Sequence, residues 1–456
     1  MSKGATRIVA EYAAGLRFEQ LPAATVEHAK QAILDVLGIA VRARFDAESS
    51  APIARAVEAL GAAGPCTVIG HGAGFAAQYA ALLNAAYAHT LDFDDTHVGS
   101  SSHPGAPIVP AALAMAEERG VSGKALIAGV VAGYDVMIHV AETANPKVHY
   151  DRGFHPTATA GTFGATAAIA NALACSADAL ENAFGINVSQ AAGSLQFLEN
   201  GSWMKRLHVG LASHNAVLAH RFSEAGVLGS AKALEGRAGF YHAYSDGVDP
   251  EALLARLGAR HQIEETAFKP YPSCRFTHAA LDELIALVRE LELQPEELES
   301  LRIALPRKGM DLVGYPEPYK RDARSVVDGQ FSMYFTAAAA ILTRGFGWSE
   351  YALLGDPRIA RVVERINVTE DPEVEALYPR MAAKVELRAR GRIHRRLSDT
   401  PKGEPEKPLT WGEIVAKFDD LAGVAYGPPR RKRIVELVRD LDRAGDVRAL
   451  TEQLGA

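Results

Sequence analysis

Apolar residues recur at helical spacing through most of the first 265 residues of the chain. Several of the segments they form are apolar around most of their circumference, which is typical of helices buried on all sides. Their many alanine and glycine residues would let helix backbones approach closely. We therefore expect a central layer of helices wrapped by others, with Thr25 as the N-cap of the first. The predicted helices span residues 24–44, 76–93, 106–120, 122–144 and 157–174.

The pattern changes after residue 278. One more helix is expected there, and then segments in which apolar and polar residues alternate, as they do in strands. One of these segments reads as a hairpin that turns near Gly391. The predicted elements are a helix at 278–292, strands at 300–306 and 365–371, the hairpin at 382–399, a loop at 400–408 and helices in the C-terminal tail.

This order of elements predicts a mainly α fold with an α+β insertion. A large all-helical domain is expected over residues 1–265, and a smaller α+β domain over residues 266–405. The C-terminal helices, residues 406–456, are expected to rejoin the helical domain.

The composition narrows the class of protein. Of the 456 residues, 48% are hydrophobic and 23% charged, as in ordinary globular proteins, and the length favours two domains. The net charge of -7 gives no reason to expect a nucleic-acid partner. The three cysteines lie far apart, which disfavours disulfides, a zinc site and an iron–sulfur cluster and fits a cytoplasmic protein. The chain contains no uninterrupted run of about 20 apolar residues, so we expect no membrane span.

One polar segment interrupts the alanine-rich helices: residues 89–104 read HTLDFDDTHVGSSSHP and hold three aspartates and three histidines. A polar helix end facing water is one interpretation. A metal site is another, since carboxylate and imidazole suit several divalent ions, but the spacing matches no common zinc pattern. The third is acid/base chemistry, in which a carboxylate holds an imidazole in one tautomer and the imidazole moves a proton near neutral pH.

Three further polar clusters lie before other helices. His155 precedes a helix start that could attract an anion, although Thr157 could equally be only its cap. A lysine–arginine pair such as the one at 205–206 is by itself typical of solvated surface. Together, however, the cations of these clusters could clamp a di- or tricarboxylate. The clusters are residues 152–164, residues 201–215 with Lys205, Arg206 and His208, and residues 268–278 with Lys269, Arg275 and His278.

These segments resemble the MmgE/PrpD family. The resemblance is carried by LLNAAYAHTLDFDDTH, HPGAPIVPAALAMAEERGVSG, GFHPTATAGTFGATAAIANAL, GSWMKRLHVGLASHN, KPYPSCRFTHAALDEL and DGQFSMYFTAAAAIL, and it covers nearly the whole chain. The family includes 2-methylcitrate dehydratase, cis-aconitate decarboxylase and iminodisuccinate epimerase. The resemblance implies a large helical domain with a smaller α+β lid, usually assembled as a homodimer.

The resemblance also implies roles for individual residues. His103 is expected to transfer the proton, with Asp92 orienting it. His155 is expected to protonate the departing hydroxyl or to hold a second carboxylate, and Lys205 to bind a substrate carboxylate. The expected substrate-binding residues are Asp95, Thr96, Lys269, His208, Arg206 and Arg275. No metal and no cofactor are expected, and the expected ligand is a small di- or tricarboxylate.

The leading functional hypothesis is dehydration of a 2-methylcitrate-like hydroxy acid by proton abstraction next to a carboxylate. Cis-aconitate-type decarboxylation and iminodisuccinate-type epimerisation are the alternatives. Cis-aconitate decarboxylases of the family place a tyrosine in the loop before the QFS segment. Leu312 stands there in this chain, and the gap between Thr96 and His103 is one residue longer, which disfavours decarboxylation. An alternative of another class is a non-catalytic helical dimer that binds carboxylates.

Overall fold

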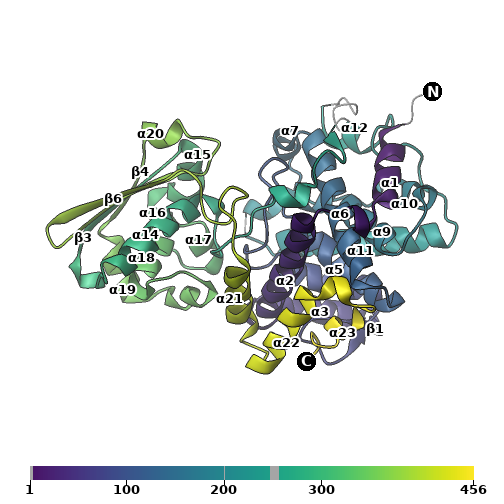
Figure 1. Ribbon diagram of the computed structural model, residues 1–456. Coiled ribbons are helices and arrows are strands. Elements are labelled where there is room, and N and C mark those ends of the chain that lie inside the picture. The colour runs from purple at the N-terminus through teal and green to yellow at the C-terminus, as the bar shows by residue number, and fades with distance from the viewer. Residues whose placement is uncertain (1–3, 200, 247–255) are drawn as a thin grey trace. The chain divides into compact units, whose positions relative to one another are not determined.

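The computed structural model describes residues 4–199, 201–246 and 256–456. The chain forms two compact units, and the first of them is discontinuous in sequence (Figure 1). Met1–Ala267 and Thr410–Ala456 make up the first unit, and Phe268–Leu409 make up the second. The C-terminal segment thus returns to the first unit after the chain has completed the second.

Helices dominate the first unit, and small residues set how closely they pack. The apolar helices α6 (Gly123–Thr143) and α9 (Gly161–Ala172) lie against each other. A Cβ on Gly133 would lie 2.9 Å from the carbonyl oxygen of Gly164, so only glycine permits this approach. The other described α-helices of the unit are α1 (Ala5–Gly15), α2 (Ala23–Asp46), α3 (Ser50–Ala59), α4 (Ala77–Ala88), α5 (Gly105–Arg119), α7 (Pro146–Asp151), α8 (Pro156–Thr159), α10 (Ala177–Asn187), α11 (Met204–Glu224), α12 (Phe240–Tyr244), α21 (Trp411–Ala422), α22 (Pro428–Arg439) and α23 (Arg448–Thr451).

The predicted mainly helical fold is confirmed, with three differences in detail. Thr25 is not an N-cap: α2 begins at Ala23 after Pro22, whose extended backbone enters the helix, and Thr25 is buried inside the helix. The segment predicted as one helix over 157–174 is divided into α8 and α9. The first unit also contains a short antiparallel pair of strands, β1 (Ala63–Thr67) and β2 (Gly74–Phe75), that the pattern did not predict.

Helix α6 has the length and hydropathy of a membrane-spanning helix. However, 89% of its most apolar window is buried inside the structure. A central helix of a large helical core has the same composition, because it must be apolar on every face. The burial therefore explains the hydropathy of α6.

The second unit contains a four-stranded sheet in the order β4-β3-β5-β6. Strand β3 pairs in parallel with β4 and antiparallel with β5, which forms a hairpin with β6. The hairpin turns at Gly391, whose φ of 69° is left-handed and favours glycine. The predicted strands are thus confirmed, as β3 (Leu298–Leu305), β4 (Ile366–Glu370), β5 (Ala383–Ala389) and β6 (Arg392–Ser398).

Helix α14 (His278–Glu290) packs on β5 and β6 and against α18 (Met333–Thr343). Both helices are buried along one or more faces, so they form the core of the second unit with the sheet. The remaining described α-helices of this unit are α15 (Arg307–Gly309), α16 (Glu317–Arg321), α17 (Val326–Gln330), α19 (Pro357–Val363) and α20 (Pro372–Glu375).

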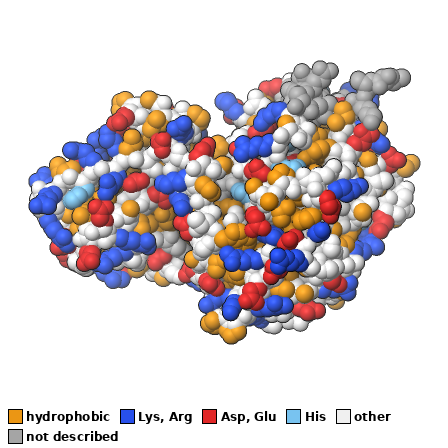
Figure 2. Space-filling model, viewed as in Figure 1, with side chains coloured by type: hydrophobic (Ala, Val, Ile, Leu, Met, Phe, Trp, Pro, Cys, Tyr) orange, Lys and Arg blue, Asp and Glu red, His pale blue; other side chains and the backbone are white. Residues whose placement is uncertain are grey.

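Exposed apolar side chains follow one another along α11. Figure 2 shows acidic and basic side chains interspersed over the face in view. On α11, Met204, Leu211 and Phe222 are 45%, 36% and 45% exposed, and Leu207 and Leu218 are partly exposed between them. Their spacing places them on one side of the helix. Contiguous exposed apolar surface of this kind marks interfaces.

We expect the chain to form a homodimer through this face of α11. The double variant Leu211→Glu/Phe222→Glu should be monomeric in light scattering at micromolar concentration, because two buried carboxylates would oppose association. Leu60→Glu is the matched control: Leu60 is 67% exposed on another helix end, so this variant should keep the mass of the wild type. A monomeric wild type would refute the prediction.

Candidate active site

The polar segment 89–104 joins two buried helices of the first unit. Helix α4 ends at Ala88, His89 caps it, and α5 begins at Gly105. Most of the segment is buried, so its side chains contact protein rather than water. Asp92 has a φ of 53° and Ser101 a φ of 50°, conformations that cost a residue other than glycine some energy. These two residues bend the segment so that its side chains turn inward.

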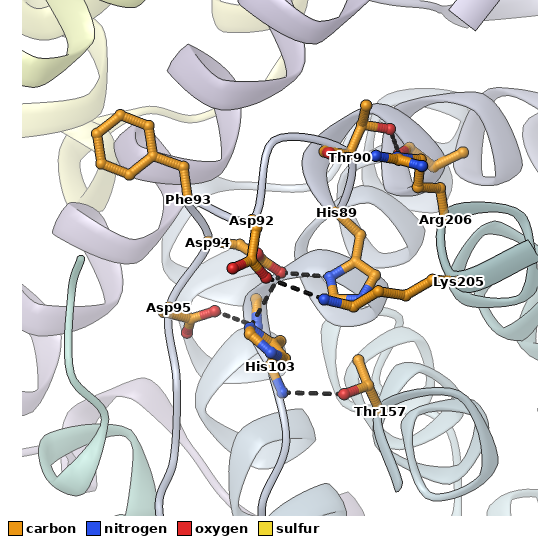
Figure 3. A network of polar contacts seen from close by, with 12 residues as sticks. His89, Thr90, Asp92, Phe93, Asp94, Asp95, His103, Thr157, Lys205 and Arg206 are labelled. Atoms are coloured by element: carbon orange, nitrogen blue, oxygen red, sulfur yellow. Dashed lines mark hydrogen bonds and ion pairs between the residues drawn. The ribbon is translucent and has the colours of Figure 1, made fainter. Parts of the chain in front are cut away.

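The carboxylate of Asp94 lies between two imidazoles (Figure 3). His89 Nδ1 is 2.6 Å from Asp94 Oδ2, and His103 Nδ1 is 3.5 Å from the same oxygen. Asp94 and His89 are fully buried, whereas the side chain of His103 retains 15% exposure. Because Nδ1 of His103 faces the carboxylate, Nε2 is the nitrogen left for a substrate. A ring placed in this way can act as a general base or acid, with Asp94 facing its other nitrogen.

Asp92, by contrast, pairs with Lys205. Their Oδ1 and Nζ atoms are 2.9 Å apart, and Lys205 comes from the first turn of α11 (Figure 3). The neighbouring Arg206 donates from Nε to the carbonyl oxygen of Thr90 at 3.2 Å. The contacts thus place Lys205 at Asp92 and His103 at Asp94, and Asp92 as the residue that orients His103 stays a prediction.

A second pair of imidazoles lies beside the first. His155 Nδ1 and His208 Nε2 are 2.8 Å apart, so the two rings share one proton. The ring of His155 also stacks on His89 with centroids 5.7 Å apart, and His89 lies 4.9 Å from His103. Burial lowers the pKa of His155 well below its usual value and that of His208 to about 3. Burial thus favours the neutral form of both His155 and His208.

Three other residues of the site make contacts that involve the main chain. Asp95 accepts hydrogen bonds from Gly105 N at 2.9 Å and Tyr134 Oη at 2.7 Å, and burial raises its pKa to about 7. Thr157 accepts from the backbone N–H of His103 at 3.2 Å. Thr96 pairs through its backbone with Ala267. Asp95 thus anchors the segment to α5 and α6, and its contact with substrate stays a prediction.

Two roles were predicted for the helix start at His155: the cap by Thr157 is wrong, and the attraction of an anion stays a prediction. Helix α8 has four residues, and Thr157 makes no capping bond there. It uses its hydroxyl to fix the backbone of His103 instead. This contact ties the two histidine clusters together through the main chain.

Lys269 and Arg275 belong to the second unit. Both are buried within it, at 2% and 5% exposure. Arg275 donates to Glu404 Oε1 at 2.7 Å and to the carbonyl oxygen of Lys402 at 3.0 Å, which gives its guanidinium an internal role there. The predicted convergence is thus seen for Asp92, His103, His155 and Lys205, and Lys269 as a substrate ligand stays a prediction.

The donor set of His89, Asp94 and His103 is also that of a metal site, because these atoms all lie within 4.8 Å of one another. Two ligands at about 2.0–2.1 Å from a tetrahedral ion lie roughly 3.3 Å apart. The 2.6 Å between His89 Nδ1 and Asp94 Oδ2 is instead the length of a charge-assisted hydrogen bond. Coordination of an ion by all three residues would require these two atoms to move apart, and the absence of a metal stays a prediction.

His89 and Asp94 are the functional residues that the sequence interpretation did not select. Both were visible in the quoted segment, and His89 precedes Asp94 by five residues, across the end of α4. A helix end followed by a left-handed residue reverses the chain, which brings such a pair together. The φ of Asp92 shows this. Aspartate adopts the left-handed region more often than most residues, but three aspartates within four positions leave open which one does so.

The sequence of the chain matches a known protein family along most of its length. The model of the MmgE/PrpD N-terminal domain matches residues 7–253, and that of the MmgE/PrpD C-terminal domain matches residues 271–443. A cis-aconitate decarboxylase from Aspergillus terreus is 26% identical over 99% of this chain and 96% of its own. The human cis-aconitate decarboxylase is 25% identical over 82% of this chain and 79% of its own.

The depressed pKa values predict how stability depends on pH. Unfolded imidazoles bind protons below about pH 6.5, whereas folded His208 does so only near its pKa of about 3. The free energy of unfolding should therefore fall as the pH decreases from about 6.5. His208→Asn should reduce this slope by about 1.4 kcal/mol per pH unit, since one proton fewer is taken up on unfolding.

Urea unfolding from about pH 4 to about pH 6.5 measures these slopes. His394→Asn, on strand β6 of the second unit, is the control and should keep the slope of the wild type. If the free energy of unfolding depended on pH equally in the wild type and in His208→Asn, His208 would not be a neutral buried imidazole.

Proposed function

The chain belongs to the MmgE/PrpD family, and on that basis and the geometry of its site we propose that it is a lyase acting on small di- or tricarboxylates. The leading reaction is dehydration of a 2-methylcitrate-like hydroxy acid. Decarboxylation of a cis-aconitate-like acid is the second candidate, because the matched relatives carry that name. The observation that supports catalysis most directly is the buried Asp94 carboxylate aimed at His103.

Removing a proton next to a carboxylate creates a dianionic, enolate-like state. Such a state needs a positioned base and a nearby cation. In the proposed mechanism, Nε2 of His103 takes the proton from carbon, and Asp94 stabilises the imidazolium that forms. Lys205 lies where it can share its charge between Asp92 and a substrate carboxylate.

Elimination of water then requires a second proton transfer, to the departing hydroxyl. His155 is suited to this step, because a polyanionic substrate attracts positive charge and so counters the effect of burial on its pKa. The carbon–oxygen bond breaks, the electron pair of the enolate forms the double bond, and water leaves. His208, hydrogen-bonded to His155, fixes its ring and shares its proton.

The two separate imidazole pairs favour dehydration over decarboxylation. Loss of carbon dioxide leaves a carbanion that needs one proton donor, whereas dehydration needs a base and an acid. Epimerisation also uses two proton transfers, at one carbon. A catalytically silent carboxylate binder would need neither pair, and a buried network of this kind costs stability unless every group is satisfied.

The test is incubation with a panel of hydroxy, unsaturated and amino polycarboxylates, followed by NMR in deuterated water. Formation of an alkene from a citrate analogue supports the proposal, and release of carbon dioxide supports the second candidate. Deuterium incorporation with inversion would indicate an epimerase. Saturable binding of these acids without any conversion would identify a carboxylate-binding protein and overturn the lyase assignment.

We predict that His103→Ala lowers kcat roughly 10²–10⁴-fold while the fold is retained, as expected for loss of a general acid or base. The side chain is partly exposed, so its truncation removes little packing. His97→Ala in the same segment is the control, because His97 bonds only within the segment, to Ser100. If His103→Ala turned over at the wild-type rate, a group other than His103 would have to transfer the proton.

We predict that activity survives chelation. Lys205 supplies positive charge at the cluster, and the His89–Asp94 distance is that of a hydrogen bond. The enzyme is treated with EDTA, desalted and assayed on the substrate found in the panel. A loss of activity that only a divalent metal restores would make Asp94, His89 and His103 metal ligands, since a lost Lewis acid costs several kcal/mol of transition-state stabilisation.

A further inference from the structure

Lys417 reaches the active-site segment from the C-terminal part of the chain. It lies on α21, which packs along α2 in the first unit, and its side chain is 7% exposed. Its Nζ donates to the carbonyl oxygen of Phe93 at 2.8 Å and pairs with Asp35 Oδ1 at 2.7 Å. The same ammonium lies 3.8 Å from the centroid of the Phe93 ring. Phe93 is therefore held at its backbone and at its side chain by one residue.

Phe93 stands between the two carboxylates that the site uses. Its ring points away from the histidines, whereas Asp92 and Asp94 point toward them (Figure 3). The carbonyl group that Lys417 binds belongs to the peptide joining Phe93 to Asp94, so the bond sets the direction in which Asp94 leaves the main chain. On the other side, Asp92 is held in a left-handed conformation with a φ of 53°. Strained residues persist only where their surroundings fix them.

The ion pair between Lys417 and Asp35 has a desolvation cost, because both charged groups are buried. Asp35 is buried and lies inside α2, and burial raises the pKa of its carboxyl while Lys417 opposes that rise. Burying an ammonium and a carboxylate together contributes little net stability, and apolar residues of similar size often serve as well. Stability alone therefore does not account for a lysine at this position.

We propose that Lys417 is a positioning residue of the active site, which holds the Phe93 carbonyl and through it orients Asp92 and Asp94. Asp35 in turn holds the ammonium in place. The role concerns the proposed lyase reaction, so its kinetic consequence rests on that function. Its structural consequence, the orientation of Asp94 between His89 and His103, does not.

The double variant Asp35→Asn/Lys417→Met tests the proposal. It removes both charges at once, so no buried charge is left unpaired and the local net charge is kept. We expect a folded protein whose kcat is lower by about 10- to 100-fold with KM changed little, because a small displacement of catalytic groups has that cost. The matched control is Lys30→Met/Asp442→Asn. That pair is equally buried on the lysine side, at 5% exposure, and 2.6 Å long, but does not contact Phe93.

Histidine NMR supplies a readout that does not depend on turnover. In protein labelled with ¹⁵N-histidine, the ring resonances of His89 and His103 should shift in Asp35→Asn/Lys417→Met and stay unchanged in the control. This holds even if no polycarboxylate proves to be a substrate, so failure of the proposed function and failure of this inference are distinguishable. Wild-type ring resonances in the folded double variant would overturn the inference, as would a wild-type kcat.

Lys417→Arg is a second test variant, to be used if the double variant does not fold. Arginine keeps the charge beside Asp35 but cannot place one donor on both partners with the same geometry. We expect this variant to fold and to show the same shift of the His89 and His103 resonances. Unchanged resonances and an unchanged kcat in Lys417→Arg would overturn the inference.

Discussion

The burial of Asp94 is the constraint on which the arrangement of the site depends. A carboxylate that no water reaches must be paired or hydrogen-bonded, or it takes up a proton. Here two imidazoles approach the same oxygen, one at hydrogen-bond length and one at 3.5 Å. That geometry fixes which nitrogen of His103 faces the protein and which is left for chemistry. Other contacts, among them those of Asp95 and of the Thr157 hydroxyl, fix the main chain that carries Asp94 and His103.

The helical scaffold makes this burial possible. Helices rich in alanine and glycine approach so closely that the polar segment between α4 and α5 is enclosed, with a C-terminal helix closing over α2. Because the first unit is assembled from both ends of the chain, the enclosure is complete only after the second unit has been made. The polar network is therefore a product of tertiary structure, and no short segment of the chain holds it alone.

This dependence on tertiary structure explains which features could be predicted from the sequence. Helix positions, the strands and the Gly391 turn followed from periodicity, because each depends on neighbouring residues only. The convergence of His103, His155 and Lys205 followed from a family resemblance. The choice among Asp92, Asp94 and Asp95 did not, since three carboxylates in four residues are equivalent until the backbone is known. The left-handed φ of Asp92 directs them to Lys205, the histidines and Tyr134 respectively. Aspartate is enriched in that conformation, but nothing in the sequence says which of the three adopts it.

The charge state of the cluster follows from the same burial and links the structure to its ligand. Burial lowers the pKa values of His89, His155 and His208 and so favours their neutral forms, and the ammonium of Lys205 pairs with Asp92. The small polyanion proposed as substrate would raise the affinity of these rings for protons. In the proposed reaction, one imidazole removes a proton from carbon and another returns one to oxygen, and the bound substrate is what makes the two rings different. On this proposal the charge of the substrate, rather than a charge of the empty site, makes the cluster reactive.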